Sequence, residues 1–377
     1  YFSRAFSLNI LHVYKTSYPL SMGGVENVID QIASQDSSNN HRVLVTCPNP
    51  QTALLNRFDS YKVFCCKSYF EIMSTPFFNP FNPIIRDLYN WADVLHYHYP
   101  WPFGDLLNLL YGKGKKYVVT YHADVIGKSF VGVLYSKNSK HFLSKADKVL
   151  ATSPDYCKSS AVLKKLSNIN IIPLGIDSNY DKQCAINPDD IFSKIKSPFY
   201  LFIGVHRYYK GLEYLVKACS LTDATIVIGG TGPETDRLKK MAVDLGLHNC
   251  IFTGFLSEQE KRFLLRNCLA FVLSSHLRSE AFGVCLLEAM AFSKPLITCD
   301  INSGMSFVNK HKVTGLVVKP SDPRALSDAM NVILNDNQLS DRYGLASRAR
   351  FLDLFTSEIM LSSYKEVYRN IFNSKKY

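Results

Sequence analysis

The stretch FYLFIGVHRYYKGLEYLVKACSLTDATIVIGG (199–230) decides the fold, because it places a helix-sized segment between two continuous apolar runs. FYLFIGV (199–205) and ATIVIGG (224–230) have the length and composition of strands that are buried on both faces. Apolar strands that alternate with helices indicate a parallel sheet with helices on both sides. The stretch therefore predicts an open, doubly wound α/β sheet.

The same alternation of apolar runs and helical patterns continues on both sides of this stretch. The earlier runs that predict strands are NILHVY (9–14), RVLVTC (42–47), YKVFCC (61–66), DVLHYH (93–98), KYVVTYH (116–122), KVLATS (148–153) and NIIPLG (170–175). The later ones are CIFTGF (250–255), LAFVLSS (269–275), PLITCD (295–300) and GLVVKP (315–320). Helical patterns occupy residues 24–35, 104–112, 235–246, 257–268 and 323–335. The chain therefore contains two series of strands, each sufficient for its own sheet.

The polar stretch DSNYDKQCAINPDD (177–190) separates the two series and is the best candidate for a linker. We therefore expect an α/β protein of two doubly wound, Rossmann-like domains that face each other across a cleft. The N-terminal domain would cover residues 1–180 and the C-terminal domain residues 190–356. The purely helical pattern at the end of the chain predicts a last helix in residues 357–377.

Composition narrows the class of protein without identifying it. The chain has 377 residues, enough for two domains, and 47% hydrophobic with 20% charged residues is typical of a globular enzyme. Basic residues exceed acidic ones by 43 − 32 = 11, which favours an anionic partner such as nucleic acid, a membrane surface or a phosphorylated ligand. No recognition module or concentrated basic arm supports nucleic acid.

Cysteine use and hydropathy bear on where the protein works. The 10 cysteines include no C-x-x-C pair, which predicts reduced thiols and a cytoplasmic protein. No apolar run reaches the roughly 18 residues that a membrane span requires. The first residues lack the order of a signal peptide. We therefore expect any membrane contact to be peripheral.

Ligands of open α/β sheets bind at the carboxyl ends of the strands, so the loops there are the first candidates for a site. After the first strand, Gly23 and Gly24 would let a ligand approach the backbone at a helix start, where N–H groups can bind phosphate. A flexible turn explains the same pair. His122 ends another strand and could act on a polar substrate, or it could be a hydrogen-bonded structural residue.

The stretch HYHYPWPFGD (96–105) holds two histidines on one strand face and an aromatic turn. His96 and His98 are spaced as a metal-binding pair, but the sequence shows no third ligand beside them. We therefore predict no metal here and interpret Trp101 and Phe103, together with His98, as a binding surface for an acceptor.

Two cations follow the first strand of the second series. Arg207 and Lys210 could together neutralise a diphosphate, because Arg binds phosphate oxygens in pairs and Lys adds a point charge. Surface cations are common, so an unspecific solvated pair is the alternative.

The next two loops of the second series hold glycines and apolar residues. Gly230, in GGTGPE (229–234), predicts a tight turn with its backbone close to a ligand. Phe255 and Leu256 could lie beside a nucleobase. Ser257 has the position of a helix cap, which explains that loop without a ligand.

The stretch SEAFGVCLLEAM (279–290) places Glu280 just before a predicted helix and Glu288 within it. If the whole span were helical, eight residues at ~1.5 Å would separate the carboxylates by ~12 Å, the scale of a sugar, a diphosphate and a ribose in line. Carboxylates accept hydrogen bonds from sugar hydroxyls, and N–H groups at a helix start attract phosphate. The residues of that helix start are Ala281, Phe282, Gly283 and Val284. Alternatively, Glu280 complements the helix dipole and Glu288 lies on a solvated face.

The pattern S-E-A-F-G-x-x-x-L-E-A-M, followed by Lys-Pro and a strand, resembles the E-x7-E signature of retaining glycosyltransferases of family 4, which adopt the GT-B fold. GGVE after the first strand, His122 at a strand end, R-x-x-K-G at 207–211 and GLVV at 315–318 occur in the order that this family uses. The resemblance extends from about Asn9 to the last helix. Family members often have a C-terminal helix that crosses back to the first domain.

The resemblance implies a nucleotide-sugar donor bound mainly in the C-terminal domain and an acceptor bound mainly in the N-terminal one. Matching the motifs assigns each residue its role: Glu280 to the donor sugar, Glu288 to the ribose, Arg207 and Lys210 to the diphosphate, Gly23 and Gly24 to the phosphates, and His122 to the reacting sugar.

The resemblance also implies retention of configuration and transfer that requires no metal or other cofactor. The chain contains no D-x-D, the usual carboxylate pattern for a divalent ion in other transferases. Fixed cations and N–H dipoles would stabilise the leaving diphosphate instead.

The stretches HVYKTSYPLSMGGVE (12–26) and HYHYPWPFGD (96–105) resemble those of bacterial enzymes that build O-antigen or other surface polysaccharides on a lipid-diphosphate carrier. The expected reaction moves a hexose from a GDP-mannose-like donor or a UDP-sugar to a lipid-linked saccharide. A basic and apolar segment, residues 127–148, could rest on the anionic inner face of the plasma membrane through Lys137, Lys140 and Lys145. A solvated helix face is the alternative for that segment.

Other functions explain the sequence less completely. A catalytically silent nucleotide-sugar-binding subunit of a polysaccharide assembly complex is the main alternative, and the presence of Glu280, His122 and Arg207 disfavours it. An epimerase of the GT-B type is disfavoured by the context of E-x7-E.

Overall fold

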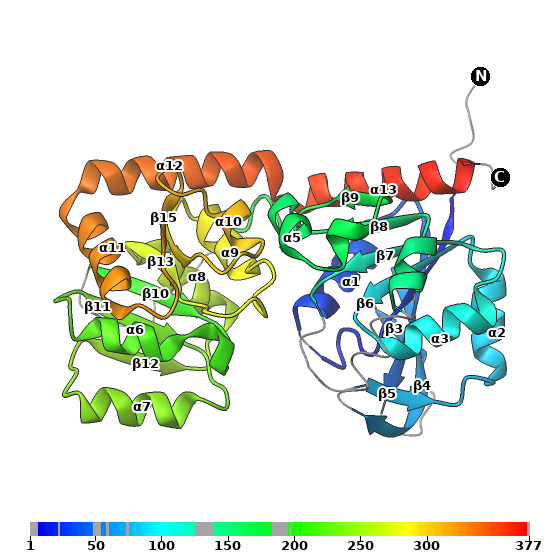
Figure 1. Ribbon diagram of the computed structural model, residues 1–377, viewed down its shortest axis with the longest axis horizontal. Coiled ribbons are helices and arrows are strands. Elements are labelled where there is room, and N and C mark those ends of the chain that lie inside the picture. Colours follow the sequence, from blue (N-terminus) through cyan, green and yellow to red (C-terminus); the bar gives the residue numbers. More distant parts are fainter. Residues whose placement is uncertain are drawn as a thin grey trace. The chain divides into compact units, whose positions relative to one another are not determined.

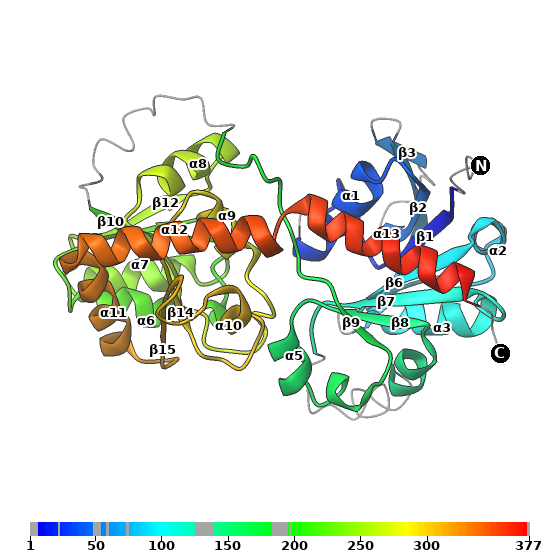
Figure 2. The ribbon, with the colours of Figure 1, turned by 90° about the horizontal axis from the view of Figure 1, so that it is seen from above.

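A computed structural model describes most of the chain, in two units. The described residues are 7–21, 23–47, 60–72, 75–124, 139–182, 195 and 198–374, with the backbone alone for 54–57. The first unit comprises Tyr1–Thr152, Ser160–Ile172 and Met360–Tyr377, and the second comprises Ser153–Ser159 and Pro173–Ile359. Each unit is a sheet with helices on both faces (Figures 1 and 2).

The described strands of the first unit form one nine-stranded sheet in the order β3-β4-β2-β1-β6-β7-β8-β9, with β5 paired to β4. The strands are β1 (Asn9–Val13), β2 (Asn40–Cys47), β3 (Leu54–Arg57), β4 (Tyr61–Ile72), β5 (Thr75–Phe78), β6 (Val94–Tyr99), β7 (Lys116–Tyr121), β8 (Lys148–Ala151) and β9 (Ile169–Ile171). The helices are α1 (Gly24–Gln35), α2 (Pro83–Trp91), α3 (Pro102–Tyr111) and most of α13 (Ser357–Asn373). Two of these described strands, β3 and β5, pair antiparallel to β4, and neither corresponds to an apolar run that we predicted as a strand.

The second unit has a six-stranded, fully parallel sheet in the order β12-β11-β10-β13-β14-β15. Its strands are β10 (Phe199–Ile203), β11 (Thr225–Gly229), β12 (Cys250–Gly254), β13 (Ala270–Leu273), β14 (Leu296–Cys299) and β15 (Gly315–Val318). Its helices are α5 (Pro154–Ser159), α6 (Leu212–Cys219), α7 (Thr235–Asp244), α8 (Glu258–Asn267), α9 (Val284–Ala291), α10 (Met305–Val308), α11 (Pro323–Asn335) and α12 (Asn337–Leu354). The predicted strands of both series are confirmed to within a few residues.

In both sheets, the strand that comes first in the chain lies in the middle, and later strands lie on either side of it. In the first, β1 lies between β2 and β6; in the second, β10 lies between β11 and β13. The strand order therefore reverses next to β1 and next to β10, and in open α/β sheets the carboxyl ends at such a reversal form the ligand crevice. We therefore expect a ligand to bind at the loops after β1, β6, β10 and β13.

The connection between the units differs from the expected boundary at residue 180. Ile176 donates its N–H to the carbonyl of Phe355 (3.0 Å) and accepts the N–H of Ser357 (2.8 Å). These bonds attach the chain to the end of α12, so it leaves the first unit after Ile172. Residues 183–190 of the expected linker lie outside the described residues.

The end of the chain completes the core of the first unit. Tyr364 and Tyr368 of α13 are fully buried, and the Tyr368 hydroxyl lies 2.7 Å from Nδ1 of His96 in β6. Figure 2 shows α13 lying across the strands of this unit. Within the described residues, no helix is long and apolar enough to cross a bilayer.

We expect Tyr368→Ala to destabilise the first unit by about 3 kcal/mol or more, because it leaves a cavity and removes a buried partner of His96. Urea unfolding followed by fluorescence measures the loss. Phe372→Ala, on the same helix but 40% exposed, is the matched control and should change stability far less. Equal stability of the two variants would show that α13 does not support the core.

Candidate functional site

Hydrogen bonds connect the loops at the carboxyl edge of the second sheet. Three backbone bonds run from His206 N to Thr231 O (3.0 Å), from Gly230 N to Gly254 O (2.7 Å) and from His276 N to Tyr209 O (3.0 Å). They join the loops after β10, β11, β12 and β13 in one continuous surface. Side chains on these loops are therefore held relative to one another by backbone contacts.

Gly230 shows how closely these loops approach. Its φ is +106°, and a Cβ at this position would lie 2.2 Å from the carbonyl oxygen of Gly204. Only glycine fits such a contact without strain. The predicted tight turn is present, and contact between two loops is sufficient to explain its glycine.

The loop after β12 combines a helix cap with an exposed aromatic ring. Ser257 accepts the N–H of Glu260, whose carboxylate accepts the N–H of Ser257, so a capping box begins α8. Phe255 is 80% exposed and Leu256 is half-buried. The capping interpretation is confirmed, and Phe255 remains available to a ligand.

The central feature of the surface is a buried ion pair between Lys210 and Glu280. Lys210 follows β10, Glu280 follows β13, and each side chain is 11% exposed. The ammonium donates to Oε2 of Glu280, which also accepts the Ser275 hydroxyl (3.3 Å). Burial lowers the pKa of Lys210, but Glu280, Cys285 and Tyr209 together raise it by more, so the net pKa lies above its ordinary value.

The pKa values of two neighbouring side chains, Cys285 and Tyr209, reflect the other charges of this surface. Burial raises the pKa of Cys285 in α9 to about 12; Lys210 opposes this rise, and Glu280 and Glu288 add to it. Both carboxylates of the E-x7-E pattern therefore act electrostatically on one thiol. Burial likewise raises the pKa of Tyr209; Glu280 adds to this rise, and Lys210 and Arg207 oppose it.

Arg207 and Glu288 differ in whether they form ion pairs with other residues. Arg207 is exposed and forms no ion pair with any residue that the structure describes. Glu288, by contrast, accepts a hydrogen bond from Lys261 of α8 (2.8 Å), which also pairs with Glu258 (2.8 Å). Glu288 is therefore fixed by a largely buried cation and does not lie on a solvated face.

The helix after Glu280 is shorter than predicted. Gly283 has a φ of +82° and precedes α9, which has only eight residues. The continuous helix from which the spacing of ~12 Å between Glu280 and Glu288 was derived is therefore not present. The Phe282 ring is buried against Phe355 (centroids 6.0 Å apart), so this ring cannot meet a ligand; Ala281 and Val284 are half-buried.

The glycine pair after β1 differs at its two positions. The carboxylate of Glu26 folds back over Gly23, where a Cβ would lie 2.3 Å from Oε2, whereas a Cβ at Gly24 would meet nothing within 4 Å. A carboxylate therefore already lies beside the position where the sequence places a phosphate at Gly23. Gly24 alone opens onto free space.

His122 follows β7 and is held by both backbone and side chain. Its N–H donates to the carbonyl of Tyr99 (3.0 Å), and its Nε2 lies 3.0 Å from Nδ1 of His98. Burial lowers the pKa of His122 to about 3, so the ring is neutral near pH 7. The side chain is half-buried, and no described residue contacts its Nδ1 by a hydrogen bond.

The predicted aromatic surface for an acceptor is wrong. Trp101 and Phe103 are each 2% exposed, and His98 is 1% exposed. Phe78 of β5 packs edge-on against Phe103 (4.7 Å), so these rings belong to the interior. The error follows from β5, which covers the start of α3 and was not predicted.

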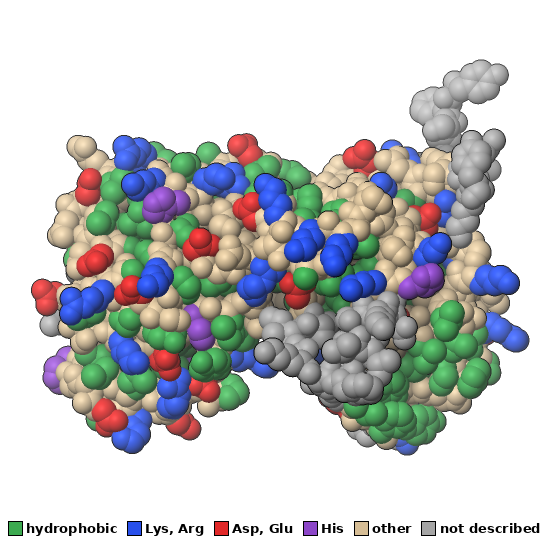
Figure 3. Space-filling model, in the orientation of Figure 1, with side chains coloured by type: hydrophobic (Ala, Val, Ile, Leu, Met, Phe, Trp, Pro, Cys, Tyr) green, Lys and Arg blue, Asp and Glu red, His purple; other side chains and the backbone are tan. Residues whose placement is uncertain are grey.

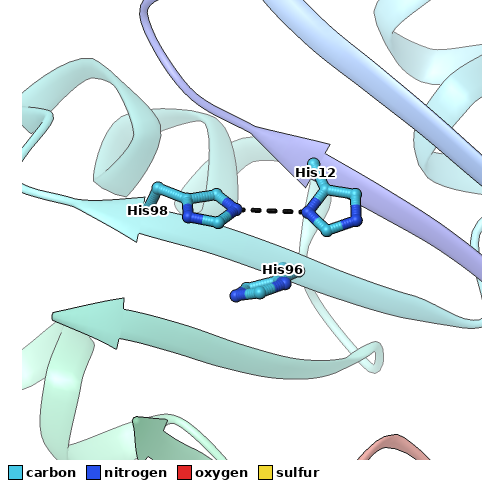
Figure 4. A group of neighbouring side chains, drawn as sticks. All are labelled: His12, His96 and His98. Carbon is cyan, nitrogen blue, oxygen red and sulfur yellow. Dashed lines mark hydrogen bonds between the residues drawn. The ribbon is translucent and has the colours of Figure 1, made fainter. Parts of the chain in front are cut away.

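Three buried histidines come together where β1 and β6 pair, and Figure 4 shows them from one side. His12 pairs with His96 in register, and nitrogens of His12, His96 and His98 lie within 4.8 Å of one another. The third ligand that the H-x-H pair lacked is thus His12. In this arrangement, however, every ring nitrogen has a hydrogen-bond partner. His96 bonds Tyr368 and Thr120, His98 bonds His12 and His122, and His12 bonds His98 and His41.

Two regions of the chain match known families: residues 22–180 match Glycosyltransferase Family 4, and residues 186–350 match Glycosyl transferases group 1. The chain is also 37% identical over 374 residues to O-antigen chain mannosyltransferase C of Escherichia coli, which covers 98% of this chain and 100% of that one. The chain belongs to glycosyltransferase family 4. The resemblance seen in the sequence is confirmed.

Other relatives and solved structures agree with this assignment. The glycosyltransferase is 38% identical over 355 residues to D-rhamnosyltransferase WbpZ of Pseudomonas aeruginosa, covering 93% of each chain. Sucrose-phosphate synthase from Thermosynechococcus elongatus has the same fold, with a TM-score of 0.80 at 19% identity over 98% of this chain and 100% of that one. Anabaena HepE in complex with UDP gives 0.77 at 18% identity over 96% and 100%. The fold is GT-B, as predicted.

Several residues of the candidate site in this glycosyltransferase were not predicted from the sequence and are identified by the structure. Lys261 and Ser275 hold the two glutamates, and neither belongs to a recognisable motif. His12 and His41 join His98 in a buried row that begins at Asp36. A histidine in each of several central strands is a signal in the sequence, but strand order and register decide whether the rings meet.

We expect the glycosyltransferase to lose stability as the pH falls from 7 to 5. Burial lowers the pKa of His12, His96, His98 and His122, so these rings stay neutral in the fold. In the unfolded chain these histidines bind protons once the pH falls below their ordinary pKa of about 6.5. At pH 5, this proton binding lowers the free energy of unfolding by about 2 kcal/mol for each histidine. Urea unfolding at both pH values measures the loss, and His96→Asn should reduce it by one histidine's share. Equal stability at both pH values would contradict the burial of these neutral rings.

Proposed function

We propose that this glycosyltransferase moves a hexose with the mannose configuration from a nucleoside diphosphate sugar to a lipid-linked saccharide in bacterial O-antigen or surface-polysaccharide synthesis. The names of its relatives support the sugar: one is a mannosyltransferase and the other a D-rhamnosyltransferase, and D-rhamnose is mannose without its 6-hydroxyl. The UDP bound by HepE supports a nucleoside diphosphate as the carrier.

The observation that carries this proposal is the Lys210–Glu280 pair at the reversal of the second sheet. A bound diphosphate would offer Lys210 a stronger anionic partner, and Glu280 would then accept hydrogen bonds from hydroxyls of the donor sugar. Arg207, exposed and without an ion pair among the described residues, would add the second cation. The N–H groups at the start of α9 complete a site for phosphate.

The remaining parts of the donor would meet the neighbouring loops. Glu288, fixed by Lys261, would accept the ribose hydroxyls. The exposed ring of Phe255 and the side chain of Leu256 would lie beside the base.

The transfer itself is proposed to retain configuration without a metal. The bond from the anomeric carbon to the diphosphate breaks, a bond to the acceptor oxygen forms on the same face, and the acceptor proton passes to the leaving phosphate. Lys210, Arg207 and the N–H dipoles stabilise the charge that develops on the diphosphate. Lys210 is largely buried, which increases the strength of its contribution.

A lipid-linked acceptor is supported by an apolar surface on the first unit. Tyr69, Phe70, Ile72 and Phe81 are 52–72% exposed on and after the β4–β5 hairpin. Figure 3 shows hydrophobic side chains gathered on the lower part of this unit. We propose that this surface contacts the cytoplasmic face of the membrane peripherally.

The basic segment expected to rest on a membrane is only partly described. Residues 127–138, including Lys137, lie outside the described residues. Lys140 and Lys145 are exposed, but Phe142 and Leu143 are buried in the core and cannot enter a bilayer. In the described part of this segment, Lys140 and Lys145 could therefore face lipid, but these two apolar side chains could not.

We expect Glu280→Gln to lower transfer by about 100-fold and Arg207→Ala to weaken nucleoside diphosphate binding about 10-fold. Glutamine keeps the shape of Glu280 but loses the charge that pairs with Lys210. Turnover of a nucleotide sugar and calorimetric binding of the diphosphate are the measurements. Lys240→Ala, an exposed cation on α7, is the matched control and should match the wild type. Normal turnover in Glu280→Gln together with normal binding in Arg207→Ala would reject the site.

The same preparation identifies the donor. A thermal-shift series with GDP, UDP, ADP and CDP should show one nucleotide that stabilises the chain far more than the others, because binding to the folded state alone raises its stability. The corresponding mannose derivative is then tested for turnover. The anomeric configuration of the product, determined by NMR, decides retention.

We expect vesicles containing anionic phospholipid to bind the chain weakly and less so at high salt. Phe70→Ser with Phe81→Ser should reduce binding because both rings are exposed and apolar. Charge reversal at Lys137, Lys140 and Lys145 tests the basic segment separately. Leu345→Ser, an exposed apolar residue of the second unit, is the control. Unchanged binding in the double and triple variants would exclude both surfaces as membrane contacts.

A further inference from the structure

Four imidazoles of the first unit form one hydrogen-bonded row that ends at a carboxylate. The contacts are His122 Nε2 to His98 Nδ1 (3.0 Å), His98 Nε2 to His12 Nδ1 (3.1 Å), His12 Nε2 to His41 Nδ1 (3.0 Å) and His41 Nε2 to Asp36 Oδ2 (3.1 Å). In every contact, the Nε2 of one histidine lies against the Nδ1 of the next histidine or, at the end of the row, against the carboxylate of Asp36. The row crosses β7, β6, β1 and β2, which are neighbours in the sheet.

Asp36 fixes the direction of the row because it can only accept. Burial alone would raise the pKa of Asp36, but hydrogen bonds from His41, Ser38 and Asn39 lower it well below its usual range. Lys365 of α13 adds an ion pair at 3.2 Å. An ionised carboxylate has no proton to donate, so His41 must carry its proton on Nε2.

The same reasoning passes along the row, since a neutral imidazole has one donor and one acceptor. With Nε2 of His41 protonated, its Nδ1 accepts from Nε2 of His12. The Nδ1 of His12 then accepts from His98, and the Nδ1 of His98 accepts from Nε2 of His122. The Nδ1 of His122 is therefore left as an acceptor.

We propose that Asp36 is a positioning residue that sets, through His41, His12 and His98, the tautomer of His122, so that His122 Nδ1 is left to accept a hydrogen bond from a substrate hydroxyl. The assignment of a substrate hydroxyl to His122 rests on the proposed function; the tautomer does not. An acceptor-only nitrogen selects a hydroxyl and excludes a second acceptor at that position.

The interior around the row preserves this order. His12 and His98 are 0% and 1% exposed, and His41 is 4% exposed, so water does not compete for their nitrogens. Desolvation lowers the pKa of His12 and His98, which keeps both rings neutral. His12 and His98 therefore keep the single donor and single acceptor that the argument requires.

The neighbouring polar groups leave the row intact. His96 lies beside it (centroid 4.3 Å from that of His98), but its two nitrogens bond Tyr368 and Thr120. Tyr14 approaches His98 edge-on, with centroids 6.1 Å apart. Apart from Asp36 and Lys365, no described charged group forms a hydrogen bond or ion pair with a member of the row.

The direct test is the position of the protons. In the full-length chain labelled with ¹⁵N-histidine, long-range ¹H–¹⁵N spectra distinguish protonated from unprotonated ring nitrogens, and single His→Gln variants assign the signals. We expect Nε2 to be protonated and Nδ1 unprotonated in His122, His98, His12 and His41. A proton on Nδ1 of His122 would overturn the proposal, as would stoichiometric metal bound by these rings in the purified protein.

The variant Asp36→Asn tests the cause. Its amide can donate to His41 Nε2, which permits the opposite order, so the single tautomer pattern should be lost. We expect kcat for sugar transfer to fall about 10- to 100-fold, as for other residues that orient an active histidine from behind. Binding of the nucleoside diphosphate should be unchanged. Tyr368→Phe, which removes the partner of His96 without touching the row, is the matched control and should keep both pattern and rate.

The remaining outcomes separate the proposal from the proposed function. Wild-type tautomers or full kcat in Asp36→Asn would overturn it. Should Asp36→Asn fail to fold, His41→Leu breaks the next link and is examined by the same two measurements, with the same outcomes. A wild-type chain that shows the expected tautomers but transfers no sugar would reject the proposed function and leave the tautomer assignment standing.

Discussion

Parallel strands all end at the same edge of a sheet, and the rest of the molecule follows from that constraint. Where the strand order reverses, beside β1 and beside β10, the following loops lead away in opposite directions, and such a point is where open α/β sheets bind ligands. Residues far apart in sequence meet there: Lys210 and Glu280 follow β10 and β13, which are adjacent in space. The charge of the site is therefore a consequence of strand order.

Buried charges require partners, and this requirement gives the second unit an arranged site before any ligand is bound. Lys210 and Glu280 satisfy each other, as do Lys261 and Glu288. A buried pair contributes little to stability because desolvation offsets its attraction. Its value here is positional: each carboxylate is held by a cation on a different loop or helix, so its direction is set by the fold.

The sequence predicts most of the strands because a strand covered on both faces is an unbroken apolar run. It fails where contacts between distant segments decide. Trp101 and Phe103 read as a surface because β5, which covers them, has no such run. The helix after Glu280 was expected to begin at Ala281 but begins at Val284, because the positive φ of Gly283 is not visible in the sequence as a break. The metal-like pair His96–His98 lacks His12 until strand register places it.

The histidine row ties the first unit's site to its last helix. Asp36 closes α1 and receives Lys365, while Tyr368 of the same helix α13 bonds His96 beside the row. The helix therefore does more than fill the core: it places a cation beside Asp36 and a hydroxyl against His96. A carboxylate at one end of four imidazoles can then determine which nitrogen His122 presents at the other. The order is transmitted by hydrogen-bond valence alone, without movement of any strand.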